Sequence, residues 1–173
     1  MKTKWYKIVG WVLVPVLGLF FVFLVWYKYE YSMAPVAPYS LNAQKMATKL
    51  LIATQGSDFK SNLTQGVVDY YKSNSVSIDV IDVSTLSEIA PEDYDAILLI
   101  HTWEYGKPPE SVQSFMDKNS DFKGKMVVMT TSGEGSEKMK NIDAISGESI
   151  LKDSPVIVAK IIARLNPLLT TEK

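Results

Sequence analysis

The sequence predicts an α/β domain built around a mostly parallel β-sheet, and three observations lead to that prediction. Tyr94–Ile100 is a short, almost wholly apolar run with no helical spacing, which suits a strand buried on both faces in the middle of a parallel sheet. Apolar runs of strand length alternate along the chain with segments of helical spacing. Polar and aromatic residues follow several of these strands directly, at the edge where open α/β sheets bind their ligands.

Composition excludes several kinds of function. The 173 residues carry a net charge of −1 with no stripe of Lys or Arg, so nothing in the sequence favours a nucleic-acid partner. The absence of cysteine excludes disulfides, thiol catalysis and Cys-ligated metal sites. With a single histidine and no nucleophile–base–acid set, we predict no metal site and name no catalytic residue. A redox role would therefore need an organic cofactor.

Residues 8–27 form an uncharged apolar run that predicts one transmembrane helix after a short tail, residues 1–7. As a helix the run is about 30 Å long, the thickness of the hydrocarbon core. Aromatic residues flank both of its ends, as they do at membrane interfaces. A cleaved signal peptide is the competing interpretation, but the run is too long and no small-x-small cleavage site follows it. We therefore expect a single-pass membrane anchor.

The distribution of lysines predicts the side of the membrane that the domain faces. Lys2, Lys4 and Lys7 precede the apolar helix, and only Lys28 follows it closely. The positive-inside bias then places the amino terminus in the cytoplasm and the soluble domain on the extracytoplasmic side. Residues 28–47 carry three tyrosines and two prolines with no periodicity, which predicts a semi-extended linker.

Residues 48–168 alternate between strand and helix patterns, and residues 169–173 are predicted to be a tail. Five strands are expected, at Lys49–Ala53, Val76–Val83, Tyr94–Ile100, Lys125–Thr130 and Ile142–Ile145. Helices are expected at Leu63–Lys72, Pro108–Lys118 and Val156–Leu165, with a helical turn at Thr85–Ile89. Asn166-Pro167 is expected to end the last helix. Right-handed βαβ units then build a doubly wound, mostly parallel five-stranded sheet with helices on both faces.

Three loops follow predicted strands: TQGSDFKSN at Thr54–Asn62, HTWEYGKPP at His101–Pro109 and TSGEG at Thr131–Gly135. In this order and spacing, from about Lys49 to Leu165, the chain resembles the flavodoxin-like superfamily. In that family the first loop holds the phosphate of FMN, and the other two flank its isoalloxazine ring. The resemblance implies a flavodoxin-like fold with FMN as cofactor. The residues implied for FMN binding are Thr54, Ser57, Lys60, Ser61, Asn62, Thr102, Trp103, Tyr105, Thr131, Ser132 and Gly133.

The first loop has the donors that a phosphate needs. Backbone N–H groups, hydroxyls and the helix dipole bind phosphate at a helix amino terminus, and Lys60 adds a positive charge. The family's usual Gly-Asn-Thr is replaced by Ser61-Asn62-Leu63, with bulky Phe59 and acidic Asp58 just before it. The alternative is that Ser61 and Asp58 only cap the helix.

The second and third loops have planar and polar groups suited to a flavin ring. Trp103 and Tyr105 can stack on the ring, or one of them can fill the crevice as part of the core. His101 is either a proton donor or a structural histidine, and Glu104 is expected to be solvated. The Thr131–Gly133 segment can bond a ring edge, although Ser-Gly turns also occur without ligands.

Asp143–Ser149, DAISGES, resembles the acceptor motif of proteins that carry covalent FMN outside the cytoplasm. That motif reads Asp-x-x-Ser/Thr-Gly-Ala-Ser/Thr, and a flavin transferase joins FMN to its last residue through a phosphoester. Glu148 stands where the motif has alanine, and Ser149 would be the acceptor. The alternative is a turn that leads into the last helix.

Two functions are consistent with these features. The first is a membrane-anchored flavodoxin-like module that binds FMN and takes part in electron transfer with a membrane protein as redox partner. The second is a flavin-less flavodoxin-like domain that acts as a binding or structural subunit of a membrane complex, which the missing Gly-Asn-Thr favours. Fold analogy alone does not choose between them.

Overall fold

The chain divides into two compact units, Met1–Met33 and Ala34–Lys173. The computed structural model describes residues 4–30, 33–42, 46–104, 106–137, 139, 142 and 144–170.

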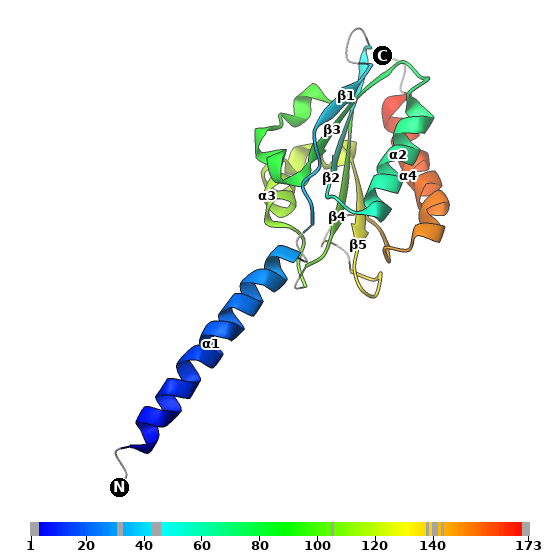
Figure 1. Cartoon of the computed structure of the whole chain (residues 1–173). Coiled ribbons are helices and arrows are strands. Elements are labelled where there is room, and N and C mark those ends of the chain that lie inside the picture. Colours follow the sequence, from blue (N-terminus) through cyan, green and yellow to red (C-terminus); the bar gives the residue numbers. More distant parts are fainter. Residues whose placement is uncertain are drawn as a thin grey trace. The chain divides into compact units, whose positions relative to one another are not determined.

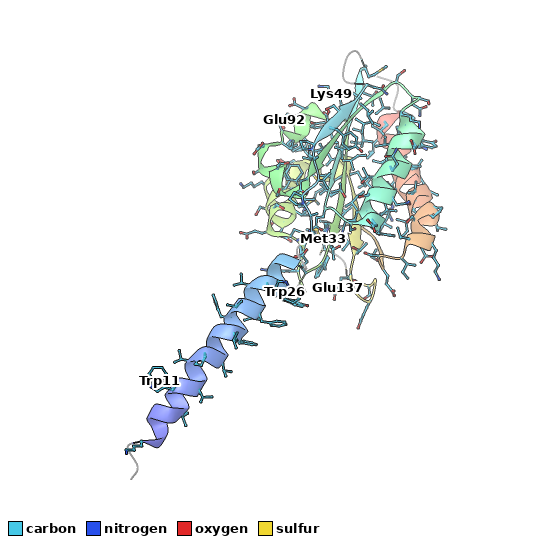
Figure 2. The ribbon with its side chains drawn as sticks, viewed as in Figure 1. Trp11, Trp26, Met33, Lys49, Glu92 and Glu137 are labelled. Atoms are coloured by element: carbon cyan, nitrogen blue, oxygen red, sulfur yellow. The ribbon has the colours of Figure 1, made fainter. Side chains whose placement is uncertain are left out.

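The first unit is built on one long helix, α1 (Trp5–Glu30). Its segment Val9–Tyr27 is 19 residues long and apolar enough to cross a membrane, and none of it is buried within the protein. Large apolar side chains project from the helix into its surroundings, as Figure 2 shows for Trp11 and Trp26. The predicted apolar helix is confirmed, although a signal sequence near an amino terminus has the same features.

The second unit contains a six-stranded sheet with the strand order β1-β3-β2-β4-β5-β6. The strands are β1 (Tyr39–Leu41), β2 (Thr48–Thr54), β3 (Val76–Asp82), β4 (Ala96–Thr102), β5 (Met126–Thr131) and β6 (Ala144–Gly147). The strands from β2 to β6 pair in parallel, and β1 pairs antiparallel with β3. The predicted α/β class and mostly parallel sheet are confirmed, and the sheet has one strand more than the five expected.

The additional strand, β1, comes from residues predicted to be linker. Ser40 lies opposite Asp79 on β3, and its hydroxyl donates to the Asp79 carboxylate at 2.5 Å. The same carboxylate accepts a hydrogen bond from the Tyr94 hydroxyl at 3.1 Å. Leu41 packs against the hydrophobic core. A three-residue strand is too short to show a period of two, so only these tertiary contacts define it.

Helices cover both faces of the sheet (Figure 1). On one face lie α2 (Asp58–Tyr71) and α4 (Ser154–Leu169). On the other lie α3 (Glu110–Lys118) and the 3-10 segment η1 (Val83–Glu88). Among the described residues between β5 and β6 there is no helix.

The central strand β4 is buried on both faces, as predicted. Leu98 and Ile100 belong to the hydrophobic cluster under α2 and α4, whereas Ile97 and Leu99 belong to the cluster under α3. All four side chains are fully buried. Burying an aliphatic side chain of this size contributes about 1.5–3 kcal/mol, so β4 anchors both halves of the core.

The helix α4 continues past Asn166-Pro167, where it was predicted to end, and reaches Leu169. Leu165 and Leu169 are both buried in the core, and the Asn166 side chain accepts a hydrogen bond from the Tyr71 hydroxyl at 2.7 Å. These tertiary contacts hold the last turn in place against the helix-breaking tendency of proline.

Candidate functional site

The carboxyl ends of β2, β4 and β5 lie side by side at one edge of the sheet. Thr54 pairs with Ile100, and Thr102 pairs with Thr131. Figure 2 labels Glu137 in the loop beyond β5 at this edge and Lys49 near the opposite edge. All three predicted loops therefore leave the sheet together, and we call this edge the strand-tip site.

Buried threonines and the single histidine form a polar layer beneath the strand-tip site. The Thr102 and Thr131 hydroxyls bond each other at 2.7 Å, and the Thr130 hydroxyl bonds His101 Nε2 at 3.2 Å. Thr130, Thr131 and His101 are fully buried. Such pairing holds the strand ends in fixed positions, because breaking it would leave buried polar groups unsatisfied.

His101 has the environment of a structural histidine. Burial, opposed by a backbone hydrogen bond at Thr102 and assisted by the positive charge of Lys60, lowers the pKa of its imidazole to about 4. The ring is therefore neutral at pH 7 and has no exposed surface from which to pass a proton. Of the two interpretations of His101, these observations favour the structural one.

Gln55 links the first loop to the second. Its side-chain oxygen accepts a hydrogen bond from Thr102 N at 2.7 Å, and its Nε2 donates to a Glu104 carboxylate oxygen at 3.4 Å. Gln55 N also donates to Ile100 O at 3.3 Å. Sequence reasoning did not select Gln55, although a polar residue directly after a buried strand is a signal that could have identified it.

The first loop ends at the amino terminus of α2, which begins five residues before the predicted Leu63. Ser57 is the N-cap, and its hydroxyl accepts a hydrogen bond from Lys60 N at 3.3 Å. The prediction that Asp58–Asn62 is loop is wrong, as is the alternative that Ser61 caps the helix. Since the first amides of a helix have no intrahelical partner, Asp58 N and Phe59 N are the backbone donors available at this terminus.

Lys60 extends its fully buried side chain towards the cap. Its Nζ lies 3.5 Å from Ser57 Oγ. Burial lowers the pKa of the ammonium group to about 8, and the negative charge of Glu104 opposes this shift. Burial and the positive end of the helix dipole both disfavour a cation here, and the Glu104 carboxylate offsets part of that cost.

The segment that precedes β1 crosses the first loop. Gly56 N donates to Ala34 O at 3.0 Å, and a Cβ on Gly56 would overlap that carbonyl oxygen. Val36 N donates to the Asp82 carboxylate at 2.9 Å. The N–H of Gly56 is thus used by the chain itself, which leaves the amides of α2 for any ligand.

The other predicted residues of the first loop lie apart from the cap. Thr54 is buried, and its hydroxyl donates to Gln55 O at 3.2 Å. Ser61 and Asn62 are exposed within the helix. The acidic Asp58 is exposed in the first turn, where the helix dipole favours a negative charge. Phosphate binding by these residues stays a prediction.

The second loop carries two aromatic residues, Trp103 and Tyr105. Tyr105 lies outside the described residues. Trp103 is half-buried and packs against the hydrophobic cluster under α3, while its backbone N–H donates to Thr131 O at 2.8 Å. This packing corresponds to the alternative in which an aromatic side chain joins the core.

The third loop forms a tight turn above β5. Ser132 Oγ accepts from Glu137 N at 3.4 Å, and Ser132 O accepts from Gly135 N at 3.2 Å. Gly135 has a φ of 64°, which favours glycine. Gly133 is exposed with open space around it.

Ser149 lies in the loop that follows β6, before the short segment η4 (Leu151–Asp153). Its side chain is exposed, and the loop leaves the same edge of the sheet because β6 is parallel to β5. Ser132 N donates to Gly147 O at 3.3 Å, which ties this loop to the third one. Asp143 lies outside the described residues, and the acceptor role of Ser149 stays a prediction.

Comparison with known proteins concerns the fold alone. No family model matches the sequence, and no curated protein matches it. Among solved structures, the flavodiiron core of Flv1 from Synechocystis sp. PCC6803 superposes with a TM-score of 0.57 and 16% identity, covering 75% of this chain. The match spans only 38% of that core. An oxidoreductase from Corynebacterium diphtheriae gives a TM-score of 0.50 with 14% identity, covering 74% of this chain and 99% of that one.

The neighbours also include an archaeal flavodoxin, with a TM-score of 0.47 and 13% identity, which covers 70% of this chain and 99% of that chain. The strand order itself defines the fold class. Without the edge strand β1, the order β3-β2-β4-β5-β6 is the 2-1-3-4-5 order of flavodoxin-like sheets. The chain therefore contains a module with the flavodoxin-like fold, and the predicted resemblance is confirmed.

Proposed function

We propose that the module binds FMN at the strand-tip site and takes part in electron transfer. The 5′-phosphate would lie at the amino terminus of α2, where Asp58 N, Phe59 N, the Ser57 hydroxyl and the Lys60 ammonium group converge. The isoalloxazine ring would lie over the tips of β4 and β5, beside Thr102 and the third loop. A bound flavin supplies reversible electron transfer, and the protein positions it.

The observation that favours this proposal most is the amino terminus of α2 at the strand-tip site, where Asp58 N and Phe59 N have no intrahelical partner. The ammonium group of Lys60 lies beside the same terminus. A dianionic phosphate there would interact favourably with the helix dipole and accept hydrogen bonds from the helix amides. The Ser57 hydroxyl, 3.5 Å from Lys60 Nζ, completes a compact set of donors.

We further propose that α1 anchors the module in a membrane, with a membrane protein as its redox partner. The 19-residue apolar segment supports an anchor by its length and composition. The lysine distribution supports an extracytoplasmic domain, where covalent attachment of FMN at Ser149 would prevent its loss.

The absorption spectrum of the full chain, purified in detergent, tests FMN binding. We expect the visible bands of a bound flavin, either as purified or after addition of FMN. Denaturation separates the two modes of attachment, because only covalent FMN stays with the chain. In that case Ser149→Ala is expected to release the flavin on denaturation, while the fold is unchanged because Ser149 is exposed. A colourless protein whose addition leaves the FMN spectrum unchanged would contradict the proposal.

The alternative function is a flavin-less binding or structural subunit of a membrane complex. One contact favours it: Ala34 O already accepts the N–H of Gly56 at the first loop. The same spectrum separates the two functions, because this alternative predicts a colourless protein that purifies with a stoichiometric partner.

A further inference from the structure

A groove of about 440 Å³ runs between the edge strand β6 and the helix α4. Its lining consists of Ala144, Ile145 and Ser146 from β6 and of Lys160, Ala163 and Arg164 from α4. The groove lies on the sheet face that α2 and α4 cover (Figure 1), since Ile145 belongs to the hydrophobic cluster under those helices. Because β6 is the last strand in the order of the sheet, no described strand covers its outer edge.

The backbone of β6 has hydrogen-bonding groups that face this open edge. Gly147 O accepts a hydrogen bond from Ser132 N at 3.3 Å, so the backbone of Gly147 faces β5. Successive residues of a strand point their N–H and C=O groups to opposite sides, and Ser146 therefore directs both groups away from β5. The strand Ala144–Gly147 contains no charged residue and no proline that would hinder the approach of another strand. It can therefore accept an added strand, the mode of recognition called β-augmentation.

The α4 wall of the groove is positively charged. Lys160 and Arg164 lie one turn apart on α4, and the described residues that line the groove include no carboxylate. Lys160 is exposed and has no ion-pair partner in the part of the chain that the structure describes. In an added strand, the side chains that face α4 recur about every 6.6 Å, close to the rise of about 6 Å between positions i and i+4 of a helix. Acidic side chains at alternate positions of a strand therefore match these two cations.

We propose that the β6 edge binds an extended segment of a partner protein that carries acidic residues at positions i and i+2. The backbone of the segment would bond the N–H and C=O groups of Ser146, and its two carboxylates would lie against Lys160 and Arg164. A second copy of this chain is a poorer occupant, because pairing β6 with β6 would bring the cations of both copies to one edge. The interaction depends neither on FMN nor on the proposed membrane anchor.

The peptide acetyl-Thr-Glu-Val-Glu-Thr-amide is the probe, added to the ¹⁵N-labelled full chain in detergent micelles. We expect it to shift the backbone amide resonance of Ser146 with saturation. The same peptide with lysine in place of both glutamates should bind at least about tenfold more weakly, since it meets like charges on α4. No saturable shift, or equal binding of the two peptides, would overturn the proposal. A shift of Ser146 on concentrating the protein alone would assign the edge to a second copy and would overturn it as well.

Two charge-reversal variants test the location. Lys160→Glu should weaken binding of the acidic peptide by about tenfold or more and should bind the lysine peptide more tightly than the wild type does. Lys152→Glu is the matched control, because Lys152 is exposed on η4, outside the groove, and the net charge changes equally. It should bind the acidic peptide like the wild type. Equal losses in the two variants, or no loss in Lys160→Glu, would contradict the groove as the binding site.

Discussion

Lys60→Met is expected to weaken FMN binding by about tenfold or more and, at pH 7, to stabilise the FMN-free protein. The first effect follows because a charge-assisted hydrogen bond to the phosphate contributes about 1.5–3 kcal/mol. The second follows because methionine occupies a similar volume and removes the desolvation cost that lowers the pKa of Lys60 from 10.5 to about 8, a shift equivalent to about 3 kcal/mol. Opposite signs for binding and stability distinguish a ligand-binding lysine from one that only supports the fold.

The stabilisation should depend on pH. Burial lowers the pKa of Lys60 to about 8 in the folded protein, against an ordinary value of 10.5. Between these values the unfolded chain binds more protons than the folded one, so wild-type stability rises with pH through this window. The advantage of Lys60→Met is therefore largest below pH 8 and shrinks towards pH 10. Denaturant unfolding at several pH values measures it.

Lys72→Met is the matched control for this experiment. Lys72 follows the same helix, but it is exposed and forms an ion pair with Asp69 at 2.7 Å. Its replacement should leave FMN affinity unchanged and stability nearly so, because exposed ion pairs contribute little. If both lysine variants lose the same affinity, or if Lys60→Met binds FMN like the wild type, Lys60 does not contact the phosphate.

A second large effect is expected on the stability of the protein at acidic pH. The pKa of His101 is lowered by burial to about 4 in the folded protein, whereas an unfolded histidine titrates near 6.5. Between pH 4 and 6.5 the unfolded chain therefore binds more protons, and stability falls as the pH falls through this window. Each pH unit between the two pKa values changes the unfolding free energy by about 1.4 kcal/mol, which gives a total loss of about 3 kcal/mol.

His101→Leu is expected to remove this part of the acid sensitivity. The variant should be less stable than the wild type at pH 7, because the Thr130 hydroxyl loses its partner at 3.2 Å. Its unfolding free energy should nevertheless fall less between pH 6.5 and pH 4. Thr130→Val is the control, since it breaks the same hydrogen bond but keeps the buried imidazole. Parallel pH curves for the wild type and His101→Leu would show that His101 does not titrate in this range.

The central strand and the parallel direction of the strands could be predicted because they depend on strong, local patterns of apolar and polar residues. The apolar run that became β4 has no helical period, and both of its faces are buried. The loops after β2, β4 and β5 were then expected at one edge, since parallel strands end together. These features depend on which residues are buried, and a run of apolar residues in the sequence indicates burial directly.

The remaining features depend on contacts between residues far apart in the chain. The edge strand β1 exists because Ser40 and Leu41 meet β3, and three residues carry no periodic signal. The start of α2 differs from the prediction because Ser57 and Ser61 are both good caps, and only the folded chain shows that Ser57 is the one that accepts from a helix amide, Lys60 N. Gln55 joins two loops through its side chain, a role that no spacing in the sequence encodes.

The measurement that tests the phosphate site most directly compares FMN with riboflavin, which has the same ring but no phosphate. Both are titrated into the full chain in detergent, and the quenching of flavin fluorescence is followed. A phosphate held by Ser57, Lys60 and the first amides of α2 predicts that FMN binds at least about tenfold more tightly than riboflavin. Equal affinities, or no binding of either flavin, would contradict an FMN phosphate site at this helix.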